Sequence, residues 1–134
     1  MTAVALFGAG GKMGMRIGRN LVASPLTVLP VEVSEAGRAR FLEAHGIACI
    51  APDEAIAAAD VVVLAVPDTV IGAVTRDLVP KLRAGTMVVI LDAAAPHAGH
   101  LPGRADITYF VTHPCHPPIF NDETDPAARA DHFG

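Results

Sequence analysis

The sequence contains no tryptophan, one tyrosine and five phenylalanines in 134 residues, so aromatic side chains supply little of any hydrophobic core. Hydrophobic residues nevertheless make up 51% of the chain, and most of them are Ala, Val, Leu and Ile. Aliphatic segments of this kind are typical of a parallel β-sheet that is covered on both faces. The length suits one domain with a substantial core. We therefore expect a single α/β domain.

The sequence also lacks an excess of basic residues. Ten Lys and Arg against 14 Asp and Glu give a formal net charge of −4, which speaks against nucleic acid or anionic lipid as a partner. No apolar run is long enough to cross a bilayer, and glycines interrupt the first apolar run too early for a secretory signal. We expect no membrane and no nucleic acid partner.

Cysteine is scarce as well. Cys49 and Cys115 are the two cysteines, too few for the disulfide framework of a small secreted domain. We therefore expect a cytoplasmic protein.

A cluster of glycines follows the first apolar segment; its members are Gly8, Gly10, Gly11 and Gly14. Residues 3–7 predict a buried strand and residues 12–23 a helix, so Lys12 and Met13 would open that helix beside the glycines. Glycines allow the backbone to approach a phosphate closely, and the amides and positive dipole end of a helix attract its charge. The segment therefore predicts a dinucleotide pyrophosphate site.

The glycine spacing departs from the usual G-x-G-x-x-G, because Met13 takes the third glycine's place. Two frames fit instead: G-x-x-G-x-x-G through Gly8, Gly11 and Gly14, or G-x-G-x-x-x-G through Gly8, Gly10 and Gly14. A Walker loop is excluded because no G-K-[ST] follows. An ordinary glycine-rich turn is the alternative.

Apolar segments and helical segments alternate along the chain, which predicts right-handed βαβ units in a doubly wound parallel sheet of Rossmann type. We expect strands near 3–7, 27–33, 47–50, 61–66, 86–91 and 107–112, and helices near 12–23, 35–45, 53–59 and 69–83. The runs at 61–66 and 87–91 show no alternation, as expected of central strands.

The segment 61–66 ends at Pro67, after which Asp68 or Thr69 can cap the next helix. Ligands of open α/β sheets bind at the carboxyl ends of strands, where the strand order reverses. We therefore expect Pro67, Asp68 and residues 92–95 to border the cofactor, with plain turn chemistry as the alternative.

An acidic residue, Glu32, ends the second expected strand, 24 residues beyond Gly8. Its carboxylate would accept hydrogen bonds from the adenosine ribose and repel a 2′-phosphate, which favours NAD. Arg38 and Arg40 follow closely, and an arginine can pair with a 2′-phosphate, so NADP stays open.

The C-terminal stretch is rich in His, Pro, Asp and Asn. His113 directly follows the last expected strand, where it could act as the base that removes a hydroxyl proton during oxidation. Three alternatives stay open: a metal site of the H-x-x-H pairs, a Cys115 nucleophile activated by histidine, and histidines that only hydrogen-bond the loop. The pairs are His97 with His100, and His113 with His116.

Four segments together carry a family resemblance: GAGGKMG, LAVPD, KLRAGTMVVILDAAAP and THPCHPPIFNDETDP. They resemble the 6-phosphogluconate dehydrogenase-related, β-hydroxyacid dehydrogenase-like oxidoreductases. The resemblance implies a Rossmann domain followed by a helical domain that closes the substrate pocket and forms a homodimer. It also implies NAD-dependent oxidation of a branched sugar acid, coupled to a rearrangement of the carbon skeleton that gives a 3-oxo product.

The resemblance also assigns roles by position: His113, His116 and Asn121 would face the nicotinamide and the substrate. Residues 1–112 would form the dinucleotide-binding domain, and residues 113–134 an active-site loop leading to a helical domain that this chain lacks. We expect the chain alone to be inactive. A non-catalytic NAD(H)-sensing domain and an NADP-dependent 3-hydroxyacid dehydrogenase remain alternatives.

Overall fold

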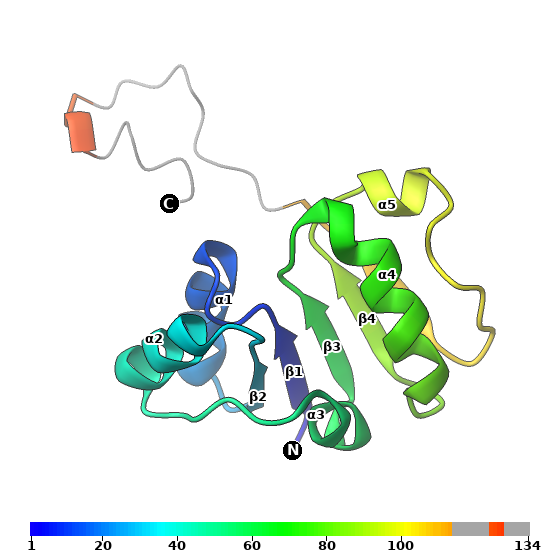
Figure 1. The fold of residues 1–134 in the computed structure, drawn as a ribbon, viewed down its shortest axis with the longest axis horizontal. Coiled ribbons are helices and arrows are strands. Elements are labelled where there is room, and N and C mark those ends of the chain that lie inside the picture. Colours follow the sequence, from blue (N-terminus) through cyan, green and yellow to red (C-terminus); the bar gives the residue numbers. More distant parts are fainter. Residues whose placement is uncertain (114–123, 128–134) are drawn as a thin grey trace.

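A computed structural model describes residues 1–113 and 124–127, and within them five parallel strands form one sheet in the order β2-β1-β3-β4-β5 (Figure 1). The elements are β1 (Ala3–Phe7), α1 (Lys12–Val22), β2 (Thr27–Val31), α2 (Glu35–His45), α3 (Pro52–Ala58), β3 (Val61–Leu64), α4 (Asp68–Leu78), a 3-10 turn (Val79–Lys81), β4 (Met87–Ile90), α5 (Ala94–His97) and β5 (Thr108–Val111). The predicted Rossmann-type sheet is confirmed.

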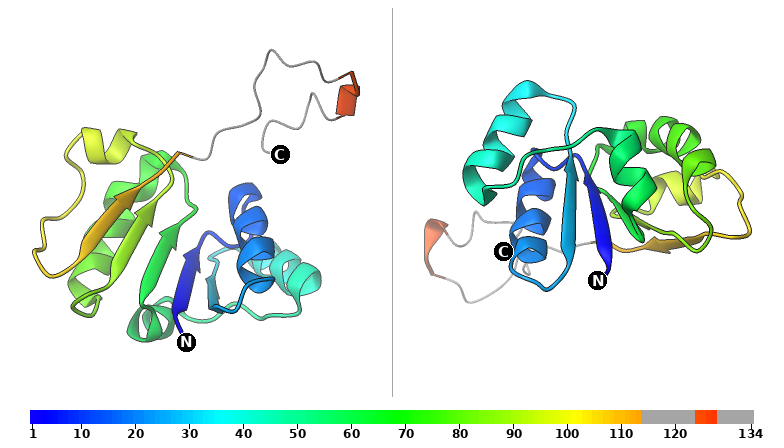
Figure 2. Two further views of the ribbon diagram at one scale, coloured as in Figure 1. Left: turned by 180° about the vertical axis from the view of Figure 1, so that it is seen from behind. Right: turned by 90° about the horizontal axis from the view of Figure 1, so that it is seen from below.

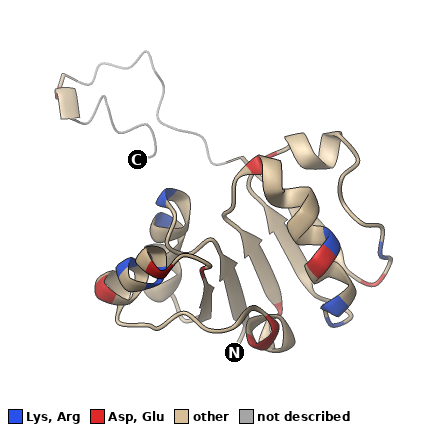
Figure 3. Ribbon diagram, viewed as in Figure 1, with Lys and Arg blue, Asp and Glu red and all other residues tan. Residues whose placement is uncertain are grey.

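The composition of the strands explains why they lie at the centre. All five are built from uncharged side chains, and the Lys, Arg, Asp and Glu residues lie on helices and connecting segments (Figure 3). Continuous apolar strands without alternation can be buried on both faces. The central strands β1 and β3 are accordingly buried along most of their length.

Helices cover both faces of the sheet, so that two apolar clusters form (Figure 2). Alternate strand residues point to opposite faces. On one face Ala5 and Val62 pack with residues of α3, α4 and α5. On the other face Val4 and Leu6 pack with α1 and with Phe41 of α2, whose ring is fully buried.

The strand order reverses at β1, which lies between β2 and β3. The chain passes from β1 to β2 on one side and then returns to place β3 on the other side. The loops that leave the carboxyl ends of β1 and β3 therefore diverge, and a crevice opens between them.

The strand predicted at 47–50 is wrong, because this segment is not assigned as a strand. It runs beside the edge strand β2, and the amide of Ile50 donates to the carbonyl of Pro30 (2.9 Å). Pro30 has no N–H to donate in return, so the pairing stops at one bond and β2 remains the edge of the sheet.

The remaining differences are at element ends and in one short helix. The helix predicted at 69–83 ends as α4 at Leu78, and a 3-10 turn containing Pro80 follows because proline cannot continue the helical hydrogen bonds. Pro67 is the N-cap of α4 and Asp68 its first residue, so the predicted capping by Asp68 or Thr69 is wrong. The short helix α5 was not predicted.

None of the helices within residues 1–113 and 124–127 is long and apolar enough to cross a membrane. The sheet ends at Val111, one residue before the domain boundary predicted at 112.

Candidate active site

A continuous cleft runs along the carboxyl ends of the strands where the order reverses. It consists of two adjoining cavities, of about 390 Å³ and 510 Å³. The smaller cavity lies between β1, β2 and β3, and the larger one between β3, β4 and the start of α1. Four residues line both cavities and mark where they join: Gly11, Ala65, Val66 and Pro67.

The turn after β1 depends on two glycines. Gly8 has φ +77°, a left-handed conformation that favours glycine, and a Cβ there would lie 2.3 Å from the carbonyl oxygen of Ala65. A Cβ on Gly14 would lie 2.0 Å from the carbonyl oxygen of Gly8. These two glycines therefore allow α1 and β3 to approach the turn closely.

Gly11 is different, because it lines both cavities and a Cβ there would lie no closer than 3.3 Å to a neighbouring atom. It is the N-cap of α1 in extended conformation, and its carbonyl accepts the first bond of the helix from Met15 (2.9 Å). Lys12 and Met13 follow as the first residues of α1 and line the larger cavity. The positive end of the helix dipole therefore faces the junction of the two cavities.

Glu32 follows β2 and lines the smaller cavity. Its carboxylate accepts hydrogen bonds from the backbone amides of Gly10 (3.0 Å) and Ser34 (2.9 Å). Partial burial raises the pKa of Glu32, but the hydrogen bonds from Ser34 and Gly10 outweigh it and hold the pKa below its ordinary value. Glu32 is therefore held as a carboxylate at the rim of the cleft.

The two arginines of α2 donate to backbone carbonyls beside the smaller cavity and do not line it. Arg38 donates to the backbone carbonyls of Glu32 (3.4 Å) and Val33 (3.2 Å), and Arg40 donates to the carbonyl of Gly10. Among the described residues Glu32 is the charged side chain that lines the smaller cavity. The charge that faces this cavity is negative.

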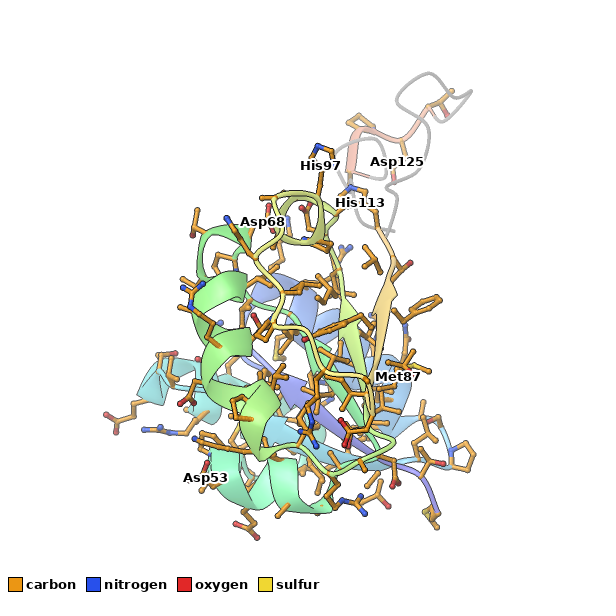
Figure 4. All side chains as sticks on the ribbon, turned by 90° about the vertical axis from the view of Figure 1, so that its right-hand side faces the viewer. Asp53, Asp68, Met87, His97, His113 and Asp125 are labelled. Atoms are coloured by element: carbon orange, nitrogen blue, oxygen red, sulfur yellow. The ribbon has the colours of Figure 1, made fainter. Side chains whose placement is uncertain are left out.

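The ionisable residues that line the larger cavity are Lys12, at the start of α1, and Asp68, Asp92 and His113. Asp68 and His113 lie at the same end of the molecule in Figure 4, away from Met87 at the start of β4. Nδ1 of His113 lies 3.7 Å from Oδ2 of Asp92, and Oδ1 of Asp92 accepts from the amide of Ala94 (2.6 Å). Asp92 is thus anchored to the backbone while its second oxygen faces the imidazole.

Residues 3–99 match the family model described as the NAD binding domain of 6-phosphogluconate dehydrogenase. The chain belongs to this family. The predicted cofactor, NAD, and the predicted class, a Rossmann-type NAD-binding oxidoreductase domain, are confirmed.

The chain is similar to two curated proteins that are about twice as long. It is 63% identical over 134 residues to D-apionate oxidoisomerase of Rhizobium rhizogenes, and 60% identical over 98% of its length to the enzyme of that name from Cupriavidus necator. It covers 49% and 48% of them, so the chain spans about half the length of these curated relatives.

A solved structure agrees with the sequence comparison. The crystal structure of a semialdehyde dehydrogenase NAD-binding protein from Cupriavidus necator, in complex with calcium and NAD, matches with a TM-score of 0.88 and 58% identity. The match covers all of this chain and 49% of that protein.

The predicted site residues are not all brought together. Of the cofactor residues, Gly8, Gly11, Lys12, Met13, Glu32, Pro67 and Asp68 line one or both cavities. Gly10 and Gly14 are absent from both linings, and the amide of Gly10 is bonded to Glu32. Among the predicted catalytic residues His113 lines the larger cavity, whereas His116 and Asn121, like Cys115, lie outside the described residues.

The alternative metal site finds no support in the part of the chain that the structure describes, where no three His, Cys, Asp or Glu side chains are placed to hold a metal. Sequence reasoning missed Gly37, which contacts the glycine turn from α2. A signal existed, because an isolated glycine inside a helical pattern often has a packing or functional reason.

Proposed function

We propose that this chain is the cofactor-binding half of a cytoplasmic, NAD-dependent oxidoisomerase that acts on a branched sugar acid, D-apionate. The observation that carries this proposal is the high identity to D-apionate oxidoisomerases along the whole chain. The cleft from Glu32 to His113 supports it, because a dinucleotide needs an elongated site at the point where the strand order reverses.

The residues of the cleft fit NAD in three parts. The smaller, mostly aliphatic cavity with Glu32 at its rim would hold the adenosine, and the carboxylate would accept from the ribose hydroxyls. The junction at Gly11 and the start of α1 would hold the pyrophosphate, since Gly11 lines both cavities and is the N-cap of α1. The nicotinamide would then lie in the larger cavity.

The larger cavity supplies the acid–base chemistry in this proposal. NAD, when bound, accepts the hydride from the carbon that is oxidised. His113 would take the proton of the substrate hydroxyl, and Asp92 would orient the imidazole. Asp68, the first residue of α4, lines the same cavity and would border the cofactor there.

The remaining length of the relatives would complete the substrate pocket. Because the chain covers about half of them, the proposed sugar-acid substrate and a homodimer belong to the full-length protein. His116 and Asn121 would contribute to the same pocket.

Cofactor binding is tested by calorimetric titration of the chain with NAD and with NADP, with its fold checked by circular dichroism. We expect saturable NAD binding and weaker NADP binding. A folded chain that binds neither at millimolar concentration contradicts the proposal.

The base is tested in the full-length enzyme by His113→Ala, with NADH formation from D-apionate as the assay. We expect turnover to fall about 100-fold or more, the usual contribution of a general base. His97→Ala is the control, because His97 is exposed on α5 and outside the lining of the larger cavity. Unchanged turnover in His113→Ala removes the assignment, and NAD binding without any sugar-acid oxidation would favour a sensing domain.

A further inference from the structure

Two glycines join the turn after β1 to helix α2. A Cβ on Gly10 would lie 2.4 Å from Cα of Gly37 and 2.5 Å from its carbonyl oxygen. The two backbones therefore touch directly, and no side chain fits between them. This contact sets the distance between the glycine turn and the first turn of α2.

Gly37 also adjoins the side chain of Glu32. A Cβ on Gly37 would lie 2.7 Å from Cγ and 2.8 Å from Cδ of Glu32, and 2.6 Å from Oγ of Ser34. Atoms at these separations overlap, so the Glu32 side chain would have to move. Gly37 is buried and its φ is not positive, so the backbone conformation itself does not require glycine.

Two backbone hydrogen bonds fix the conformation of Glu32 that a side chain at Gly37 would disturb. Its two oxygens accept hydrogen bonds from the amides of Gly10 and Ser34. In this conformation the Glu32 side chain lies against Gly37, where a Cβ would otherwise be. A carboxylate driven out of this position would lose both amides and would swing toward solvent. It would no longer present a fixed negative charge at the rim of the smaller cavity.

We propose that Gly37 is a positioning residue for cofactor choice: its missing side chain keeps the Glu32 carboxylate against the amides of Gly10 and Ser34, where it selects NAD over NADP. This inference rests on the proposed contact between Glu32 and the adenosine ribose. Gly37 lines neither cavity, and it would affect the choice of cofactor through the position of the Glu32 carboxylate.

The test compares Gly37→Ala with the unaltered chain by titration with NAD and with NADP. Loss of hydrogen bonds from the ribose to a fixed carboxylate should weaken NAD binding by roughly 10-fold or more. NADP binding should be unchanged or tighter, because the repelling charge has moved away from the 2′-phosphate. Gly103→Ala is the matched control, since nothing lies within 4 Å of a Cβ at Gly103.

A double-mutant cycle with Glu32→Ala separates positioning from a general structural effect. Glu32→Ala removes the two Glu32 atoms that the new methyl group would overlap, while the overlap with Oγ of Ser34 is the same in both backgrounds. Gly37→Ala should therefore add little to the loss of NAD affinity when the carboxylate is already absent. If the two effects simply add, Gly37 acts through the fold and the inference is wrong.

Folding gives further decisive outcomes. If Gly37→Ala unfolds but the double variant folds, the overlap with Glu32 is shown and the inference is supported. If both unfold, glycine serves the fold and the inference falls. Failure of the proposed function looks different, because the unaltered chain would then bind neither NAD nor NADP.

Discussion

The closest approach in the glycine turn gives the sharpest prediction. A Cβ on Gly14 would lie 2.0 Å from the carbonyl oxygen of Gly8 and 2.8 Å from backbone atoms of Ala9, where ordinary contact begins at 3.4 Å. The same carbonyl accepts from the amide of Gly11 (3.0 Å). Gly14→Ala therefore has no flexible side chain to push aside and must separate α1 from the turn.

The size of the effect follows from two opposing contributions. Overpacking against rigid neighbours costs about 1–3 kcal/mol, and the overlap at Gly14 is large. Alanine recovers up to about 1 kcal/mol through its better helix propensity. We expect Gly14→Ala to lower the free energy of unfolding by about 2 kcal/mol, measured by urea denaturation, and to weaken NAD binding because the turn is displaced.

Gly11→Ala is the control for Gly14→Ala, because it adds the same methyl group at a less crowded position of the same turn. A Cβ there would lie 3.3 Å from the carbonyl oxygen of Gly8 and 4.0 Å from that of Ala65, in a backbone conformation that alanine adopts. The free energy of unfolding should fall by no more than about 1 kcal/mol, because alanine is a poorer N-cap residue than glycine. NAD affinity should fall about 10-fold, because the methyl group adds bulk where the pyrophosphate would bind. Equal stability losses in Gly11→Ala and Gly14→Ala, or none in Gly14→Ala, would refute this division of roles.

Three further changes probe the core, the charge at the rim and the base. Phe41→Ala should lower the free energy of unfolding by about 3–5 kcal/mol in urea, because the ring is fully buried against Gly18; a loss below about 1 kcal/mol would contradict this packing. The pKa of Glu32 is lower in the folded chain than its value of about 4.3 in the unfolded chain, so the carboxylate stabilises the fold above that pH, and this contribution is lost as the pH falls through the folded pKa. The difference in the free energy of unfolding between Glu32→Gln and the unaltered chain should therefore shrink below about pH 4. A difference that widens on acidification would contradict this prediction. Asp92→Asn should reduce turnover of the full-length enzyme about 10-fold through His113 with little change in KM, and an unchanged kcat would show that Asp92 does not orient the imidazole.

The local parts of the fold could be read from the sequence. The run at residues 3–7, the glycines after it and the helix from Lys12 were predicted correctly because strand, turn and helix each have their own short-range pattern. The run at 47–50 has the same apolar character as a strand, yet it forms none. The segment lies beside Pro30 of β2, which has no N–H to donate to it, and this neighbour is distant in the sequence.

The site followed the same division. The sequence indicated Glu32 and Asp68 as cofactor residues, and both line the cleft, but their contacts with NAD remain predictions. It could not indicate that Gly10 would pack on Gly37, since that contact joins two turns from different βα units. Nor could it show that Asp92 would face His113 across neighbouring strands.

By itself the sequence determined most of the order of strands and helices, the uncharged centre of the sheet and the glycine turn, because periodicity and glycine placement act over a few neighbouring residues. Only the tertiary structure decided which glycines serve packing and which one faces the cleft, and where the Glu32 carboxylate is held. The reason is physical: steric overlap and hydrogen bonding depend on distances between backbones that lie far apart along the chain.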